Sequence, residues 1–162
     1  MLSYHFQHIG RLTRDQQIAL DKLQSFLDSD DRVFLLKGYA GSGKTTLLKG
    51  LAAYLSQLKK PFAMMAPTGR AAKVLSSKTG IEAATIHRSI YNFKNLEELK
   101  SKDDSGDISY LYWFGLSDQS ESHRRVFIVD EASMVSDKYS IQEFFRFGSG
   151  QLLRDLLEFS RV

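Results

Sequence analysis

Hydrophobic residues along the chain recur at spacings of three and four positions in three places, and this periodicity predicts helices. The first lies at residues 13–27, where Thr13 and Gln16 have the spacing of an N-terminal capping box. The second lies at residues 45–58 and places its leucines on one face. The third is an amphipathic helix around residues 152–157. We expect each helix to bury one apolar face against a common core.

Three short apolar runs, at residues 33–36, 62–66 and 126–129, are typical of strands buried in a sheet. Shorter helices are expected at residues 69–76 and near Thr85. Because strands alternate with helices, the pattern predicts an α/β fold. Its mostly parallel sheet would be sandwiched between helices.

Residues 93–125 differ in character from the rest of the chain. Residues 100–107 are charged and contain glycine, which favours a loop, and residues 108–114 are rich in aromatic side chains. This pattern predicts a protruding hairpin. Its rings would either stack on nucleic-acid bases or pack on the domain, and aromatic residues in strands more often pack. The rings in question belong to Tyr110, Tyr112, Trp113 and Phe114.

Composition narrows the class of protein. The chain has 162 residues, 43% of them hydrophobic and 25% charged, which is ordinary for a single globular domain. It has no cysteine, which excludes a disulfide scaffold, a cysteine zinc site and a thiol nucleophile. No apolar run approaches the ~20 residues of a membrane span, and the N-terminus lacks a secretory signal pattern. We therefore expect a soluble, cytoplasmic protein with no membrane partner.

Positive charge is concentrated in one part of the sequence. The net charge of the chain is only +3, but residues 59–94 contain seven cationic residues and one anionic residue. Such a basic segment is typical of a nucleic-acid footprint. A solvated surface on which charges cluster by chance is the alternative interpretation.

The strongest chemical signal is the segment Gly-Tyr-Ala-Gly-Ser-Gly-Lys-Thr at residues 38–45, which fits the P-loop (Walker A) pattern G-x-x-x-x-G-K-[ST]. Glycines let backbone amides approach a phosphate closely, and the N-terminus of the following helix favours an anion. Lys44 would supply charge to the β- and γ-phosphates, and Thr45 a hydroxyl to Mg²⁺. The residues expected to bind nucleotide are Gly38, Gly41, Ser42, Gly43, Lys44, Thr45 and Thr46.

A second signal is the pair of carboxylates that follows the apolar run 126–129. Ligands bind at the carboxyl ends of strands in open α/β sheets. Asp130 would hold Mg²⁺, and Glu131 would orient and deprotonate an attacking water. Such a pair by itself is often only a polar boundary after a strand. Together with Lys44, these two residues predict the catalytic set of a nucleoside triphosphatase that uses ATP or ADP and Mg²⁺.

Four segments, at residues 38–46, 66–73, 85–87 and 129–134, closely resemble in sequence and order the first half of RecD-like superfamily 1 DNA helicases. The stretch 12–16 is similar to the family's adenine-reading Q motif. The resemblance implies one RecA-like P-loop NTPase domain over residues 1–162. This would be the first motor domain of a DNA helicase, with a hairpin insertion at about 93–125 that splits the duplex. Relatives of this family move 5′ to 3′ on single-stranded DNA and act in repair and recombination.

The resemblance also assigns roles to residues outside the phosphate loop. Gln16 would contact the adenine base, although it could instead only cap its helix by bonding back to Thr13. Both roles are compatible through different atoms. The DNA-contacting positions implied are Pro67, Thr68, Arg70, Thr85 and His87, all within the basic segment.

The departures from the family are equally informative. The second RecA-like domain, the partner that supplies a charge-stabilising arginine, and the family's later motifs are absent from these 162 residues. We therefore expect the chain alone to bind nucleotide weakly, to hydrolyse it slowly if at all, and not to unwind DNA. The alternative function is a P-loop nucleotide-binding regulatory module without unwinding activity.

Overall fold

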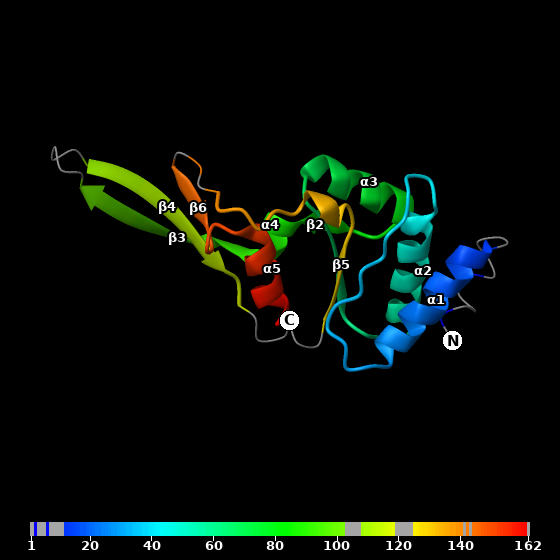
Figure 1. The fold of residues 1–162 in the computed structure, drawn as a ribbon. Coiled ribbons are helices and arrows are strands. Elements are labelled where there is room, and N and C mark those ends of the chain that lie inside the picture. Colours follow the sequence, from blue (N-terminus) through cyan, green and yellow to red (C-terminus); the bar gives the residue numbers. More distant parts are fainter. Residues whose placement is uncertain are drawn as a thin grey trace.

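A computed structural model of the chain describes residues 2, 6, 12–102, 108–118, 125–140, 142 and 144–161. Figure 1 shows a body of helices around a small sheet and, on one side of it, a long arm of strands. Most of the predicted loop at 100–107 lies outside the described residues, as does part of the predicted insertion.

The body is built on a parallel three-stranded sheet in the order β2 (Ala83–Thr85), β1 (Phe62–Ala66), β5 (Val126–Val129). Successive side chains of a strand point to opposite faces. Met64 accordingly joins one buried cluster and Met65 the other. The apolar runs predicted as strands at 62–66 and 126–129 are therefore confirmed.

Helices cover both faces of this sheet. They are α1 (Arg14–Leu27), α2 (Lys44–Gln57), α3 (Gly69–Thr79), α4 (Ile86–Ile90) and α5 (Leu152–Ser160). The first three contribute apolar side chains to one cluster, and the last two to the other. Each predicted helix is present, with α3 three residues longer than expected. The predicted α/β class, a parallel sheet between helices as in RecA-like P-loop NTPases, is confirmed.

The strand predicted at residues 33–36 is not formed. The segment does alternate as a strand would, because Phe34 and Leu36 pack on the core while Val33 and Leu35 are 59% and 64% exposed. It forms no backbone hydrogen bond with any described residue, and the described sheet ends at β5, which is paired to β1 alone. An extended segment becomes a strand only beside another strand, so the prediction is wrong for this structure.

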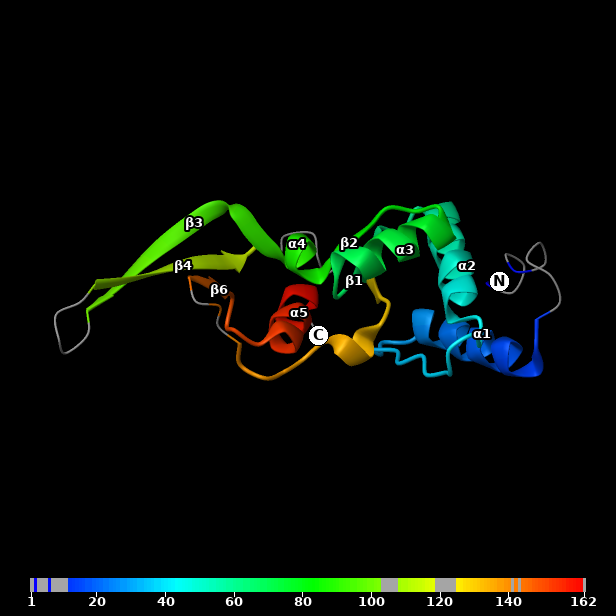
Figure 2. The ribbon, with the colours of Figure 1, turned by 90° about the horizontal axis from the view of Figure 1, so that it is seen from above.

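The arm is a second sheet, which we define as β3 (Tyr91–Lys102), β4 (Ile108–Leu116) and β6 (Phe145–Phe147). β3 and β4 form the predicted antiparallel hairpin, and Figure 2 shows them extending away from α1 and α2. β6 was not predicted, and it pairs in parallel with β4. Three residues are too short for a detectable alternation, so only the neighbouring β4 makes β6 recognisable.

The aromatic side chains of the arm pack mainly on one another. The Phe114 and Phe147 rings stack with centroids 5.2 Å apart and an interplanar angle of 14°. The Trp113 Nε1 donates a hydrogen bond of 2.9 Å to the Gly148 carbonyl. Tyr110 is 45% exposed, with the Lys100 ammonium 5.5 Å from its ring centroid. Packing thus accounts for Phe114 and Trp113, while the Tyr110 ring is partly exposed and has the Lys100 ammonium over it. No helix in the described part of the chain is long and apolar enough to cross a membrane.

Candidate nucleotide-binding and DNA-binding site

The phosphate loop leads directly into α2, and its residues 38–42 are exposed. Gly43 is the N-cap of α2, in the left-handed conformation with φ of 89°, and no side chain caps the helix. The first amides of a helix have no partner within it, so those of Lys44, Thr45 and Thr46 can donate hydrogen bonds to an external oxygen. Gly41 also has a positive φ, of 78°, and nothing lies within 4 Å of its open side. The loop and the start of α2 therefore form a cradle of backbone amides, an arrangement that suits an anion.

The Lys44 side chain folds back over this loop. Its Nζ donates hydrogen bonds of 2.7 Å to the Gly38 carbonyl and 2.9 Å to the Tyr39 carbonyl. No ion pair to a carboxylate is recorded for this ammonium in the described part of the chain. Its charge is therefore compensated only by neutral carbonyls, and a phosphate would be a stronger acceptor.

Gln16 joins α1 to the phosphate loop and caps its own helix. Its Oε1 accepts from the Thr13 amide at 3.0 Å, and the Thr13 Oγ1 accepts from the Gln16 amide at 3.2 Å, so the predicted capping box is confirmed. Its Nε2 donates to the Ser42 carbonyl at 3.1 Å. A Cβ on Gly43 would collide with this amide group. The Gln16 side chain thus lies against the phosphate loop, and its contact with adenine stays a prediction.

The predicted carboxylates lie at the carboxyl edge of the sheet. The Asp130 amide donates to the Met65 carbonyl at 3.0 Å, which fixes Asp130 just beyond β5. Asp130 Oδ1 accepts from the Glu131 amide at 3.0 Å. Glu131 has a φ of 53°, a left-handed conformation that is rare for a residue with a side chain and that occurs often at functional sites. Its side chain is exposed, and its predicted role in activating a water molecule stays a prediction.

Three of the predicted DNA-contacting residues share this edge. Thr85 ends β2 in register with Ala66, directly before Pro67. The Thr68 and Thr85 hydroxyls cap α3 and α4, accepting from backbone amides at 3.2 Å and 3.1 Å. Each hydroxyl keeps its proton for donation to a phosphate oxygen.

Arg70 is exposed in the first turn of α3. A cation there opposes the helix dipole, and no acidic partner is recorded for it among the described residues. Arg70 thus presents its charge to solvent, and its contact with DNA stays a prediction.

His87 is half-buried, as are Pro67 and Thr85, and its ring packs against two other rings. Its ring lies 5.5 Å from that of Tyr91 and 5.2 Å from that of Phe147, centroid to centroid. Burial lowers the pKa of His87, and the negative charge of Asp155 partly opposes that shift. The ring is therefore mainly neutral near pH 7, and its part in DNA binding stays a prediction.

The predicted residues thus form two groups. Gln16 lies with the phosphate loop, and Asp130 and Glu131 lie with the threonines at the sheet edge. Within the described ranges no hydrogen bond or ion pair joins the two groups, and no three His, Cys, Asp or Glu side chains cluster as a metal site. The Thr45 hydroxyl and the Asp130 carboxylate are nonetheless hard oxygen donors of the kind that Mg²⁺ prefers, together with phosphate oxygens.

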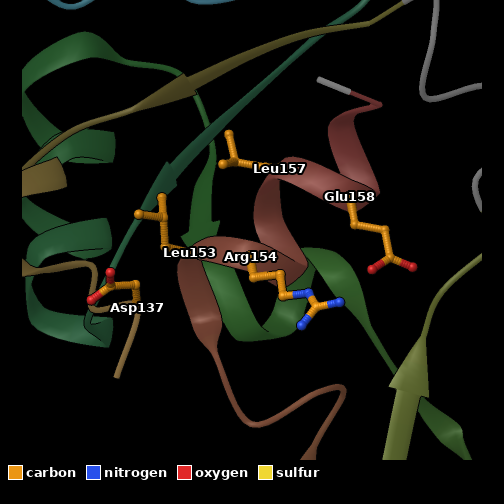
Figure 3. A pocket seen from close by; sticks show the side chains of 5 residues that line it. All are labelled: Asp137, Leu153, Arg154, Leu157 and Glu158. Carbon is orange, nitrogen blue, oxygen red and sulfur yellow. The ribbon is translucent and has the colours of Figure 1, made fainter. Parts of the chain in front are cut away.

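A surface pocket beside α5 shares no residue with either group. Figure 3 shows its lining, with the two leucines along one side of the helix. The lining residues are Asp137, Leu153, Arg154, Leu157 and Glu158, none of which was predicted as a site residue. The pocket shares no residue with the phosphate loop. It gives no support to a nucleotide site there.

Comparison with known proteins identifies relatives. A family of proteins described as the AAA domain matches residues 11–147. Over 77 residues, or 48% of this chain, the sequence is 36% identical to the ATP-dependent RecD2 DNA helicase of Deinococcus radiodurans. Over 110 residues, or 65% of the chain, it is 32% identical to an uncharacterized protein, MJ1519, of Methanocaldococcus jannaschii.

These relatives are much longer proteins. The matched stretches cover 10% of the Deinococcus radiodurans helicase and 9% of the Methanocaldococcus jannaschii protein. No solved structure matches the chain.

Proposed function

Because the chain belongs to the AAA-domain family and resembles the RecD-like helicases, we propose that it is the ATP-binding motor domain of a DNA helicase. In this proposal the domain binds Mg²⁺ with ATP or ADP, contacts single-stranded DNA and moves 5′ to 3′ during repair or recombination. One observation carries the proposal: an uncapped helix begins at a left-handed glycine, with a lysine ammonium held over the same loop.

Nucleotide binding would use groups that already face the cradle. The amides at the start of α2 donate to phosphate oxygens, and the Lys44 ammonium moves from the loop carbonyls to the β- and γ-phosphates. At an effective dielectric near 20, two unit charges ~4 Å apart interact by about 4 kcal/mol. Gln16 holds the loop through the Ser42 carbonyl and presents its amide to the adenine base.

Hydrolysis would need the second group of residues as well. Thr45 and Asp130 are the residues that would hold Mg²⁺, and the ion supplies positive charge at the phosphates. The Glu131 carboxylate, exposed beside Asp130, would accept the proton of the attacking water. Since no recorded contact joins these carboxylates to the phosphate loop, the two groups must approach each other for catalysis.

The arginine that stabilises charge in such enzymes contributes roughly 10³–10⁵ in rate. In this proposal a second RecA-like domain, outside the 162 residues, supplies it. The chain alone is therefore expected to hydrolyse ATP slowly and not to unwind a duplex.

Single-stranded DNA would follow the sheet edge beside Asp130. Thr68 and Thr85 would donate to backbone phosphates, Arg70 would neutralise one, and Pro67 and His87 would border the path. The arm would divide the duplex ahead of this path. Its hairpin lies at the position in the sequence where RecD-like helicases carry their insertion.

The decisive experiment compares Lys44→Ala with Lys49→Ala, an exposed lysine of the same helix, in binding a fluorescent ATP analogue with Mg²⁺. Removing the Lys44 charge should weaken binding by at least about tenfold, and Lys49→Ala should leave it unchanged. Equal affinities of the Lys44→Ala variant and the parent would refute the nucleotide site.

DNA binding is tested separately, by fluorescence anisotropy with a single-stranded oligonucleotide. Arg70→Ala should weaken binding and reduce the slope against log salt by about 1, whereas Lys22→Ala on α1 should not. Nucleotide binding without any DNA binding would favour the regulatory-module alternative.

A further inference from the structure

A buried carboxylate lies where the arm joins the body. Asp155 on α5 is 1% exposed, and no salt bridge is recorded for it among the described residues. An ionised carboxylate in such a place is costly unless hydrogen bonds satisfy its oxygens. The hydrogen bonds that the Asp155 carboxylate receives from its neighbours therefore decide whether its burial is tolerated.

Two parts of the arm supply those hydrogen bonds. The Tyr91 hydroxyl, at the first residue of β3, donates to Asp155 Oδ2 at 2.6 Å. The Ser149 amide, two residues beyond β6, lies 3.1 Å from each carboxylate oxygen. Gly148 has a φ of 48°, and a Cβ there would collide with the carboxylate. The carboxylate of α5 thus connects both chain segments through which β3 and β6 meet the body.

The third strand of the arm, β4, also meets the body next to Tyr91. The Ser117 amide, just after β4, donates to the Ile90 carbonyl at 2.7 Å, next to Tyr91. The Gly148 amide donates to the Phe114 carbonyl at 2.9 Å. All three strands of the arm are therefore anchored around Asp155.

The same tyrosine also contacts His87, one of the predicted DNA-binding residues. The Tyr91 ring lies 5.5 Å from the His87 ring, and Phe147 packs against both. α4, which carries His87, begins at the cap residue Thr85. The Tyr91 side chain therefore contacts Asp155 through its hydroxyl and His87 through its ring.

We propose that Tyr91 and Asp155 are positioning residues, which together fix the direction of the arm and the orientation of His87 toward single-stranded DNA. The proposal rests on the DNA-binding function proposed above. A small change at the base of the arm has a large effect at its tip, because β3 has 12 residues and a strand of that length spans about 40 Å. A tilt of about 10° at the base moves the tip by about 7 Å, enough to misplace it against a duplex.

The experiment measures the distance between spin labels on the arm and the body of the 162-residue chain. Since the chain has no cysteine, Glu97→Cys on β3 and Lys78→Cys on α3 give two unique and exposed labelling positions. The parent should show one narrow distance distribution. Tyr91→Phe keeps the ring and removes the hydroxyl, and it should broaden the distribution at least about twofold or shift its centre by several ångströms. Tyr110→Phe, the same change near the arm tip, should do neither.

Other outcomes decide against the proposal. An unchanged distribution in Tyr91→Phe and in Asp155→Asn, with unchanged circular dichroism, would overturn it. Loss of the folded signal in Tyr91→Phe would also overturn it, because the hydroxyl would then support the fold and not the arm's direction.

A second measurement separates this inference from the proposed function. In Tyr91→Phe, single-stranded DNA binding should weaken by about three- to tenfold while binding of the ATP analogue is unchanged. If the parent bound no DNA at all, the proposed function would fail. The spin-label distances would still decide whether the contact between Tyr91 and Asp155 fixes the direction of the arm.

Discussion

Gly41 and Gly43 of the phosphate loop differ in the space beside them, and this difference permits a quantitative test of the loop geometry. Gly41 and Gly43 have φ of 78° and 89°, so alanine at either position must adopt a left-handed conformation. That conformation costs about 1–2 kcal/mol for a residue with a Cβ. The added Cβ meets nothing within 4 Å at Gly41, but at Gly43 it collides with the Gln16 amide group.

The collision adds a second cost at Gly43. Gln16 must move away, and its hydrogen bond to the Ser42 carbonyl is lost, which costs about 1 kcal/mol more. Gly41→Ala should therefore lower the free energy of unfolding by about 1–2 kcal/mol and Gly43→Ala by about 2–3 kcal/mol. Urea denaturation followed by circular dichroism measures both values.

A double-mutant cycle isolates the collision. In a Gln16→Ala background the obstructing side chain is gone, so the cost of Gly43→Ala should fall to that of Gly41→Ala. The cost of Gly41→Ala should be the same in both backgrounds. If Gly43→Ala costs the same with and without Gln16, then Gln16 does not lie against the loop, and its proposed role in holding the loop fails.

Two further predictions concern the core and the arm joint. Gly50→Ala in α2 should destabilise the protein by about 1–3 kcal/mol in urea denaturation, although alanine is the better helix former, because its Cβ would collide with the buried Phe6 ring. A Phe6→Leu background should relieve this cost, and a stabilising Gly50→Ala would place Phe6 elsewhere. Burial lowers the pKa of His87 below its ordinary 6.5, so the unfolded chain binds its proton more readily and stability falls as the pH drops below about 6.5. His87→Gln should flatten this part of the plot of unfolding free energy against pH. An identical plot for the variant and the parent would show that the His87 ring is not buried against Tyr91 and Phe147.

Local features were predicted well where neighbouring residues decide them. The capping box of Thr13 and Gln16 involves atoms three residues apart, and it forms as expected. The buried runs at β1 and β5, the amphipathic α5 and the hairpin of the arm also follow from patterns within single segments. The phosphate loop itself is a local structure, since its glycines and the start of α2 are consecutive in the chain.

Features that depend on distant partners could not be read from such patterns. Residues 33–36 have the alternation of a strand, yet a strand also needs a neighbour, and the described sheet offers none beside them. The motif around His87 predicts a DNA contact, and that role stays a prediction. The motif gave no sign that the His87 ring packs against Tyr91 and Phe147, which come from a different sheet.

The sequence by itself therefore determined the class of fold, the helices α1 to α5 and the strands β1 and β5 of the body, because these depend on the order of adjacent residues. The strand β2 was not predicted, and the phosphate chemistry of the loop stays a prediction. Only the tertiary structure decided that β6 joins the arm, that Gln16 bonds to the Ser42 carbonyl, and that Asp155 is buried against Tyr91. These contacts join residues 26 to 64 positions apart, or strands separated by the whole of β5. Their geometry depends on how the helices and the two sheets pack together, which the spacing of residue types along a chain does not specify.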